Sequence, residues 1–178
     1  MYGMIHRALR QMVLNERGKE AWVSIELAAG VEPSDFISSA TYPDEVTQRL
    51  LSISSEMLGQ DMDDLLTQFG RFWIRYAETS SFAPILSFTG RDIVSFVANL
   101  DRMHRTIEDV MPHAIMPSFS VLTDNVGQMT IEYRSTRTGL APFVTGLFLG
   151  LLDRFNLTGS VEIISKDSAK HVFLVEYR

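Results

Sequence analysis

The sequence predicts an α+β fold, with helices over about residues 1–111 and a four-stranded antiparallel sheet with one inserted helix over about residues 112–178. Two patterns predict it. Before residue 111 the apolar side chains recur at the i, i+3, i+4 and i+7 spacing of amphipathic helices, and after it they alternate with a period of two. A chain of 178 residues without a linker or an internal repeat is expected to form a single domain, residues 1–178.

Four amphipathic segments precede residue 80, and each is expected to be a helix. They cover residues 2–15, 19–29, 44–58 and 61–78. Glycines at positions 18, 30 and 59 mark the expected ends. Gly70, in the middle of the fourth segment, costs about 1 kcal/mol relative to alanine in a helix, so we expect close packing or a bend there. Residues 82–88 are expected to form a short apolar link.

A single helix is expected from Asp92 to Met111. His104 lies four residues after Leu100 and three before Ile107, so it points into the apolar stripe of that helix. The charged side chains are expected on the opposite side; they are Asp101, Arg102, Arg105, Glu108 and Asp109. From these residues alone, His104 is either a hydrogen-bonded core residue or a ligand to something that the core contains.

The remaining elements are four strands and one helix. The strands are expected at residues 118–122, 128–135, 160–165 and 171–177. A turn at residues 124–127 joins the first two strands. The helix, residues 139–155, carries Gly146 and Gly150 one turn apart, so another element can approach its backbone closely.

Composition excludes several classes of function. The chain has no cysteine, which rules out disulfides, thiolate zinc sites, iron–sulfur clusters and thiolate-ligated haem, and leaves histidine as the main soft ligand. A net charge of -6 argues against a general nucleic-acid binder. No apolar stretch reaches the ~18 residues that span a bilayer, and the N-terminus lacks the apolar core of a signal peptide. We therefore expect a cytoplasmic protein that does not bind nucleic acid or insert into a membrane.

Tyr133, Ser135 and Arg137 form a motif at strand spacing, which would project all three side chains to one face. Two hydroxyls and a guanidinium on one stripe suit a carboxylate ligand, because arginine binds carboxylates in bidentate fashion and hydroxyls satisfy the remaining lone pairs. The alternative is a solvated strand edge. Together with an inward histidine, however, such a clamp is what a haem with two propionates needs.

These residues also resemble a known family. His104 in NLDRMH, Pro117 in MPSF and the Tyr-x-Ser-x-Arg motif are similar to those of the H-NOX domain, the haem nitric oxide/oxygen-binding domain that is also the sensor of soluble guanylate cyclase. The resemblance extends from MYGMI through FGRFW and GLAPFVTGL to the final strand. It implies a haem b between the helical and sheet parts. In the family the residue matching His104 is the only protein ligand to the iron, the Tyr-Ser-Arg set holds the propionates, and the proline presses on the porphyrin.

The resemblance also implies a distal pocket above the iron. The matching residues are Met4, Ile5, Trp73, Phe143 and Leu147, and Leu100 is a further expected haem contact. Phe143 has no hydrogen-bond donor, and Trp73 is the one distal residue of this set that carries an N–H. We therefore expect nitric oxide and carbon monoxide to bind ferrous haem while oxygen is held weakly or not at all. The pocket lacks the groups that peroxide cleavage requires, so we do not expect an enzyme.

Nitric oxide weakens the bond opposite to it, so the link between the iron and His104 is expected to stretch or break and the helical part to shift relative to the sheet part. Gly70 and residues 82–90 are the expected hinge positions. The family's stand-alone sensors are commonly paired with a separate histidine kinase or a cyclic-di-GMP enzyme, so the resemblance implies such a partner acting in trans.

Two alternatives remain open. In one, His104 is structural and the chain is a haem-free α+β module that binds an apolar ligand or a protein. In the other, the haem binds oxygen and Trp73 donates a hydrogen bond to it. The other histidines, His6, His113 and His171, show no ligand spacing and are expected to be surface or satisfied residues.

Overall fold

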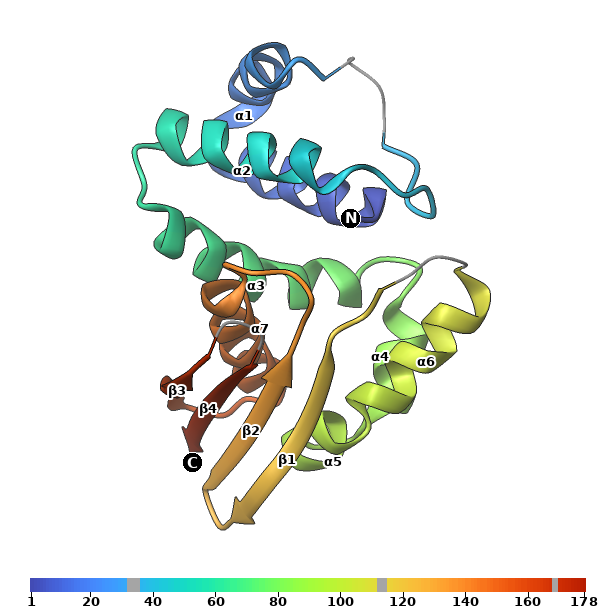
Figure 1. The fold of residues 1–178 in the computed structure, drawn as a ribbon, viewed down its shortest axis with the longest axis vertical. Coiled ribbons are helices and arrows are strands. Elements are labelled where there is room, and N and C mark those ends of the chain that lie inside the picture. Colours follow the sequence, from blue (N-terminus) through green and yellow to red (C-terminus); the bar gives the residue numbers. More distant parts are fainter. Residues whose placement is uncertain (32–35, 112–114, 168–169) are drawn as a thin grey trace. The chain divides into compact units, whose positions relative to one another are not determined.

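The computed structural model describes residues 1–31, 36–111, 115–167 and 170–178 (Figure 1). The chain forms two compact units, residues 1–69 and 70–178. Their boundary falls inside the helix α3 (Met62–Glu78) rather than at the change from helices to strands. The α+β architecture predicted from the sequence is confirmed, whereas a single haem-binding domain over residues 1–178 stays a prediction.

The first unit contains α1 (Gly3–Ala29), α2 (Asp44–Leu58) and the first turns of α3. Gly18 interrupts α1 with φ 80° and ψ -178°, a conformation that glycine adopts without steric cost, so the two helices predicted on either side of it are confirmed. Gly30 and Gly59 end α1 and α2 with φ 61° and φ 65°, the left-handed cap conformation. Residues 32–35, between α1 and α2, lie outside the described residues.

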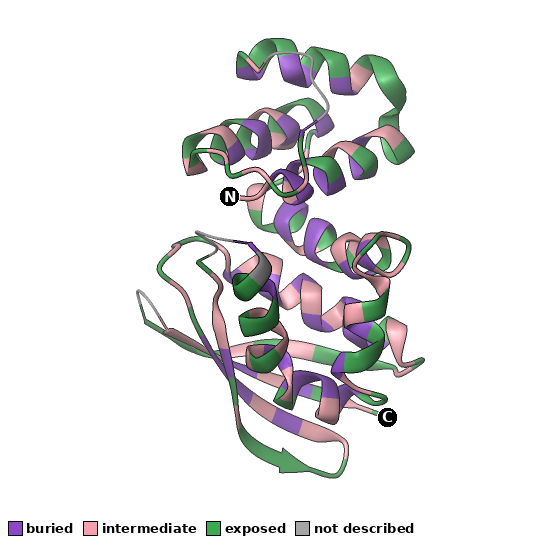
Figure 2. Cartoon of the chain, turned by 90° about the vertical axis from the view of Figure 1, so that its right-hand side faces the viewer, coloured by how far each residue is buried: buried purple, intermediate pink, exposed green. Residues whose placement is uncertain are grey.

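In the first unit the apolar faces of α1 and α2 are buried (Figure 2). The largest fully buried side chains there are Leu9, Met12, Trp22, Ile25, Phe36, Leu50, Leu65 and Phe69. Those on α1 and α3 lie three or four residues from a neighbour in the set, because that spacing places one side of a helix toward the core. The amphipathic pattern of the sequence therefore determines which side of each helix is buried.

The second unit differs from the predicted helices in two places. Residues 82–88, expected to be a link, belong largely to the short helix α4 (Ala83–Thr89), which has a proline in its first turn. The single helix expected from Asp92 to Met111 is divided into α5 (Ile93–Ala98) and α6 (Leu100–Val110). The division falls at Asn99, whose side-chain amide donates to the carbonyl oxygens of Thr89 and Ser95 at 2.9 and 2.8 Å. These local hydrogen bonds compete with continuation of the helix.

The sheet has the strand order β1-β2-β4-β3, and every neighbouring pair is antiparallel. The strands are β1 (Ser118–Asn125), β2 (Gln128–Arg134), β3 (Gly159–Lys166) and β4 (Lys170–Tyr177). Asn125 pairs with Gln128, so the first hairpin turns at residues 126 and 127, where Gly127 has φ 74°. The four predicted strands are confirmed, but β1 extends three residues further than expected, to Asn125, and β2 ends one residue earlier, at Arg134.

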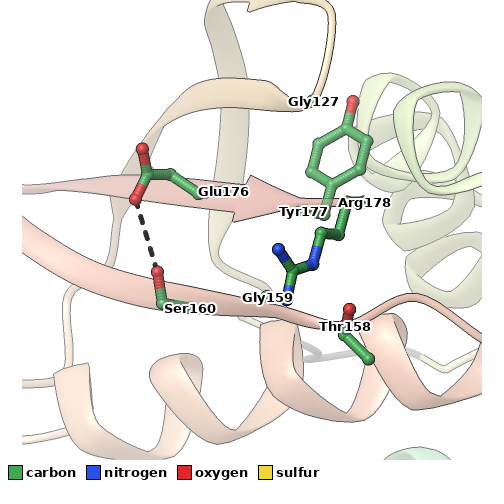
Figure 3. A pocket seen from close by; sticks show the side chains of 7 residues that line it. All are labelled: Gly127, Thr158, Gly159, Ser160, Glu176, Tyr177 and Arg178. Carbon is green, nitrogen blue, oxygen red and sulfur yellow. Dashed lines mark hydrogen bonds between the residues drawn. The ribbon is translucent and has the colours of Figure 1, made fainter.

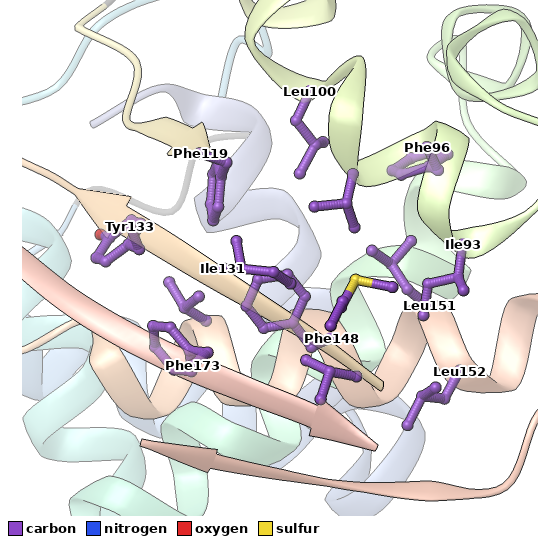
Figure 4. Close-up of a cluster of buried hydrophobic side chains, with 14 of the residues drawn as sticks. Ile93, Phe96, Leu100, Phe119, Ile131, Tyr133, Phe148, Leu151, Leu152 and Phe173 are labelled. Carbon is purple, nitrogen blue, oxygen red and sulfur yellow. The ribbon is translucent and has the colours of Figure 1, made fainter. Parts of the chain in front are cut away.

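One face of the sheet is buried under α7 (Ala141–Arg154), the inserted helix, and under α5 (Figure 4). Met129, Ile131, Phe173 and Val175 are completely buried on this face, and Phe148 of α7 packs on Phe173 with ring centroids 5.4 Å apart. Met129, Ile131 and Tyr133 of β2 alternate along the strand and are all buried in this core.

Within the second unit, α3 and α7 approach each other through glycine. A side-chain carbon added at Gly70 would lie only 2.9 Å from the backbone nitrogen of Leu147 and 3.0 Å from the Cα of Gly146. One added at Gly150 would lie 2.8 Å from a side-chain carbon of Ile74. The close packing predicted at Gly70 is therefore confirmed. Among the helices of the described residues, none is both long and apolar enough to span a membrane.

Candidate functional site

His104 lies on α6, and one of its ring nitrogens forms a hydrogen bond. Its Nδ1 is 2.9 Å from the carbonyl oxygen of Pro117. Because a carbonyl oxygen can only accept, Nδ1 carries the proton and Nε2 keeps its lone pair. Burial lowers the pKa of His104, against the opposing effects of the Pro117 hydrogen bond and of the Asp101 and Glu108 charges. A neutral, half-buried imidazole held through Nδ1 is suited to bind a metal through Nε2.

Tyr133, Ser135 and Arg137 are brought together, but the reason differs from the one predicted. Tyr133 is buried near the end of β2, whereas Ser135 and Arg137 lie beyond the strand, so strand alternation does not place all three. The Ser135 hydroxyl accepts the backbone N–H of Arg137 at 3.0 Å. Burial raises the pKa of Tyr133, opposed by a hydrogen bond with the Ser135 side chain and by the positive charge of Arg137. The three groups therefore share one polar site.

Phe119 and Ile115 connect this polar site to His104. The Phe119 ring centroid is 5.9 Å from that of His104 and 5.2 Å from that of Tyr133 (Figure 4). On the other side, the Arg137 Nη1 donates to the carbonyl oxygen of Ile115 at 2.9 Å, two residues before Pro117. The histidine, the proline and the three polar residues thus form one continuous network within the second unit.

The chemistry of this donor set fits a haem. A neutral imidazole is the usual protein ligand of haem iron where no thiolate is available. The phenol, hydroxyl and guanidinium are donors of the kind that bind carboxylates such as the two propionates. Among the described residues there is no group of three or more histidine, aspartate or glutamate side chains that could hold a bare metal ion. His104 therefore offers a single ligand.

The distal candidates of the second unit come from α3 and α7, the two helices whose backbones meet at Gly70. Trp73, Phe143 and Leu147 are all half-buried. The Trp73 ring stacks on that of Tyr76, with centroids 5.8 Å apart. Leu100 is buried in the core of the same unit, one turn before His104. Met4, which is buried, and Ile5, which is half-buried, belong to the first unit, and their part in the site stays a prediction.

Two acidic residues of α6 were assigned to the wrong side of the helix. Asp101 Oδ1 accepts the backbone N–H of Phe119 at 2.7 Å, and Glu108 Oε1 accepts that of Met116 at 3.2 Å. Both therefore lie on the side of α6 that faces the segment after it. Their spacing of three and four residues from His104 contained this information, because residues three and four apart share a helix face.

His6 and His171 are placed differently from the expectation. His6 is completely buried in the first unit, with Nε2 2.8 Å from Thr47 Oγ1 and no hydrogen-bond partner for Nδ1 among the described residues. His171 is half-buried on β4, opposite Tyr133, with ring centroids 6.2 Å apart. Its Nδ1 is buried and has no hydrogen-bond partner in the described part of the chain. His113 lies outside the described residues.

A separate surface hollow lies beside the paired ends of β3 and β4 (Figure 3). It is lined by Gly127, Thr158, Gly159, Ser160, Glu176, Tyr177 and Arg178. The Ser160 hydroxyl donates to Glu176 Oε2 across it, at 3.5 Å. It contains none of the residues that the sequence singled out, so it is distinct from the His104 site.

Comparison with solved structures identifies the fold. The chain matches an H-NOX protein from S. oneidensis in the Fe(II)NO ligation state with a TM-score of 0.89 and 18% identity, covering 100% of this chain and 99% of that one. It matches the Fe(II) unliganded H-NOX protein from K. algicida with a TM-score of 0.84 and 24% identity, covering 100% and 97%. The chain therefore has the fold of the H-NOX class of proteins.

The family follows from the sequence. A family model described as Haem-NO-binding matches residues 2–163, and the chain belongs to this family of haem-binding gas-sensor domains. Soluble guanylate cyclase gcy-35 of Caenorhabditis elegans is 26% identical over 187 residues, covering 99% of this chain and 26% of that protein. Soluble guanylate cyclase 89Da of Drosophila melanogaster is 25% identical over 146 residues, covering 82% and 22%. The chain thus spans about a quarter of the length of these relatives.

Proposed function

We propose that this domain binds haem b through Nε2 of His104 and senses nitric oxide, with carbon monoxide as a second ligand and oxygen excluded. The observation that carries the proposal is the hydrogen bond from His104 Nδ1 to the Pro117 carbonyl at 2.9 Å, because it leaves Nε2 as the ligating atom. When bound there, ferrous haem would supply the metal centre that binds the gas.

The polar residues of the network have a separate role. Tyr133, Ser135 and Arg137 would donate hydrogen bonds to the propionates, and the Arg137 guanidinium would balance their charge. Pro117 would contact the porphyrin, and its carbonyl orients His104. The contacts that join these residues through Phe119 and Ile115 support this assignment, because one connected network positions the ligand and the clamp together.

Selectivity against oxygen depends on the distal side. Bound oxygen is strongly polarised and is stabilised by a hydrogen-bond donor, whereas nitric oxide and carbon monoxide need none. Phe143 and Leu147 on α7 are apolar and offer no side-chain donor. Trp73 has an indole N–H, and in this proposal its role is to fill space against Tyr76.

The output is a change of conformation rather than turnover of a substrate. The domain signals in the cytoplasm to a separate protein, either a histidine kinase or a cyclic-di-GMP enzyme. The curated relatives are named soluble guanylate cyclases, so a cyclase is the competing output. A change in how His104 is held would be transmitted through α6, and Gly70 and residues 82–90 are the proposed hinge positions.

The visible spectrum of the anaerobic ferrous protein tests this proposal. We expect a five-coordinate, histidine-ligated haem, a changed spectrum on adding nitric oxide or carbon monoxide, and no stable oxygen complex in air. The matched variant is Trp73→Phe, which removes the indole N–H and keeps an aromatic ring. It should leave the spectra with nitric oxide and carbon monoxide unchanged.

A colourless protein that takes up no added haemin would contradict haem binding and leave the chain as an α+β ligand-binding or partner-binding module. A stable oxygen complex in the unmodified protein, lost in Trp73→Phe, would instead identify an oxygen sensor with Trp73 as the donor.

A further inference from the structure

Three hydrogen bonds join α6 to the segment that follows it, residues 116–119. Asp101 Oδ1 accepts the Phe119 N–H at 2.7 Å, His104 Nδ1–H donates to the Pro117 carbonyl at 2.9 Å, and Glu108 Oε1 accepts the Met116 N–H at 3.2 Å. We refer to these three bonds as the α6 ladder. Residues 101, 104 and 108 share one helix face, and their partners follow in the reverse order along the chain.

The middle bond of the ladder depends on the outer two. Pro117 precedes β1, which begins at Ser118, so its carbonyl lies outside the strand pairing of the sheet. Proline has no backbone N–H, so Pro117 cannot donate a backbone hydrogen bond of its own. The backbone on either side of it is fixed to α6 through Met116 and Phe119. The two carboxylates therefore hold the Pro117 carbonyl at hydrogen-bonding distance from His104.

The two outer bonds are unequal. The Asp101 bond is shorter and partly buried, whereas the Glu108 bond is longer and exposed to solvent. A hydrogen bond to a charged acceptor is stronger when it is short and shielded from water. Asp101 is therefore expected to contribute more than Glu108 to holding the carbonyl.

We propose that Asp101 and Glu108 are positioning residues that hold the Pro117 carbonyl against His104 and so set the strength of Nε2 as an iron ligand. A hydrogen bond donated by the second ring nitrogen fixes the orientation of a ligating imidazole and makes it a stronger donor to the metal. Neither carboxylate contacts the iron in this proposal. The inference rests on the proposed haem ligation by His104.

Two readouts test the ladder on the haem-loaded protein. One is the exchange rate of the His104 Nδ1 proton, followed by ¹⁵N-edited NMR in the diamagnetic carbon monoxide complex. The other is the stretching frequency of the iron–histidine bond in the ferrous protein. In Asp101→Ala we expect about tenfold faster proton exchange and a lower stretching frequency, because the Pro117 carbonyl is no longer held. Glu108→Ala should change both readouts in the same direction and by less.

Matched variants distinguish a positioning role of Asp101 from a general effect of charge and from a folding defect. Asp109→Ala removes the same charge from an exposed position of α6 that takes no part in the ladder, so both readouts should stay at the unmodified values. Asp101→Asn keeps the shape and an oxygen acceptor for the Phe119 N–H, so it should restore most of what Asp101→Ala loses. If Asp101→Ala does not fold, the comparison of Glu108→Ala with Asp109→Ala keeps the test possible.

The outcomes distinguish this inference from the proposed function. An unmodified protein that takes up no haem would overturn both. An unmodified protein with histidine-ligated haem, combined with unchanged proton exchange and stretching frequency in Asp101→Ala and Glu108→Ala, would overturn the positioning role alone. Equal changes in Asp109→Ala and Asp101→Ala would also overturn it, since a general charge effect would then be sufficient.

Discussion

His6 in the first unit and His104 in the second are both histidines whose pKa is lowered by burial, yet their surroundings differ. His6 is completely buried, with Phe36 and Tyr42 rings around it at centroid distances of 4.5 and 5.2 Å. Its Nε2 is bonded to Thr47, and the pKa falls to about 4. His104 is half-buried, its Nδ1 is bonded to a carbonyl oxygen, and Nε2 keeps its lone pair.

The difference shows that burial alone does not make a histidine a ligand. His6 is enclosed on all sides, so no external group reaches its ring, and its neutral form serves the packing of the first unit. His104 is only half-buried, with its tautomer fixed by Pro117 and Nε2 left with its lone pair. In our proposal, this fixed tautomer and the free lone pair of Nε2 distinguish His104 from His6.

The largest expected effect is the loss of haem in His104→Ala. Removing the single protein ligand should abolish haem retention through purification, and added imidazole should restore part of it by occupying the vacated space beside the iron. The measurement is the ratio of haem absorbance to protein concentration, with and without imidazole. His6→Gln is the matched control and should keep its haem.

Equal haem retention in His104→Ala and the unmodified protein would contradict the assignment of His104. Loss of haem in both histidine variants would mean that the two residues do not differ in the way proposed.

The second-largest expected effect is a pH dependence of the free energy of unfolding, caused by His6. Its pKa is about 4 in the folded protein and 6.5 ordinarily, so the unfolded chain binds the proton first as the pH falls. The stabilisation is fully present above pH 6.5 and is lost between pH 6.5 and 4. The free energy of unfolding of the first unit should fall by about 3 kcal/mol over that range.

Urea unfolding at several pH values measures this effect. In a Trp73→Phe background Trp22 is the remaining tryptophan, and its fluorescence reports on the first unit. His6→Gln should show a smaller change in the free energy of unfolding with pH than the background protein. The same slope in His6→Gln and the background protein would show that another group causes the acid sensitivity.

The smallest effect is expected from Thr47→Val, which removes the hydroxyl that is 2.8 Å from His6 Nε2 and keeps the side-chain volume. A buried ring nitrogen then loses its partner, so the free energy of unfolding at pH 7 should fall by about 1 to 2 kcal/mol. Haem content should not change. A Thr47→Val protein as stable as the unmodified one would show that the hydrogen bond contributes nothing net.

Most of the fold could be predicted because it follows from local patterns. The breaks at Gly18, Gly30 and Gly59 coincide with positive φ angles that glycine adopts most easily, and the four strands coincide with segments where apolar residues alternate in the sequence. The division of the predicted helix at Asn99 was missed because it depends on hydrogen bonds to Thr89 and Ser95. The helix α4 was missed because its seven residues give too little periodicity to separate a helix from a loop.

The candidate site could be predicted in its members but only partly in its geometry. The types and order of His104, Pro117, Tyr133, Ser135 and Arg137 suggested a haem site before any contact was known. Strand alternation was the wrong reason for grouping the last three, because β2 ends at Arg134 and the loop brings Ser135 and Arg137 back to Tyr133. A loop that turns back in this way has no regular side-chain spacing, so a sequence pattern cannot predict it.

By itself, the sequence determined the class of fold, the positions of most helices and strands, and the set of residues from which a haem site could be built. These depend on the periodicity of apolar side chains and on residue chemistry, which are properties of the chain read locally. Only the tertiary structure decided which nitrogen of His104 is bonded, that Asp101 and Glu108 face the segment around Pro117, and that His6 is enclosed. Those facts depend on hydrogen bonds between residues 8 to 41 positions apart, which local periodicity does not specify.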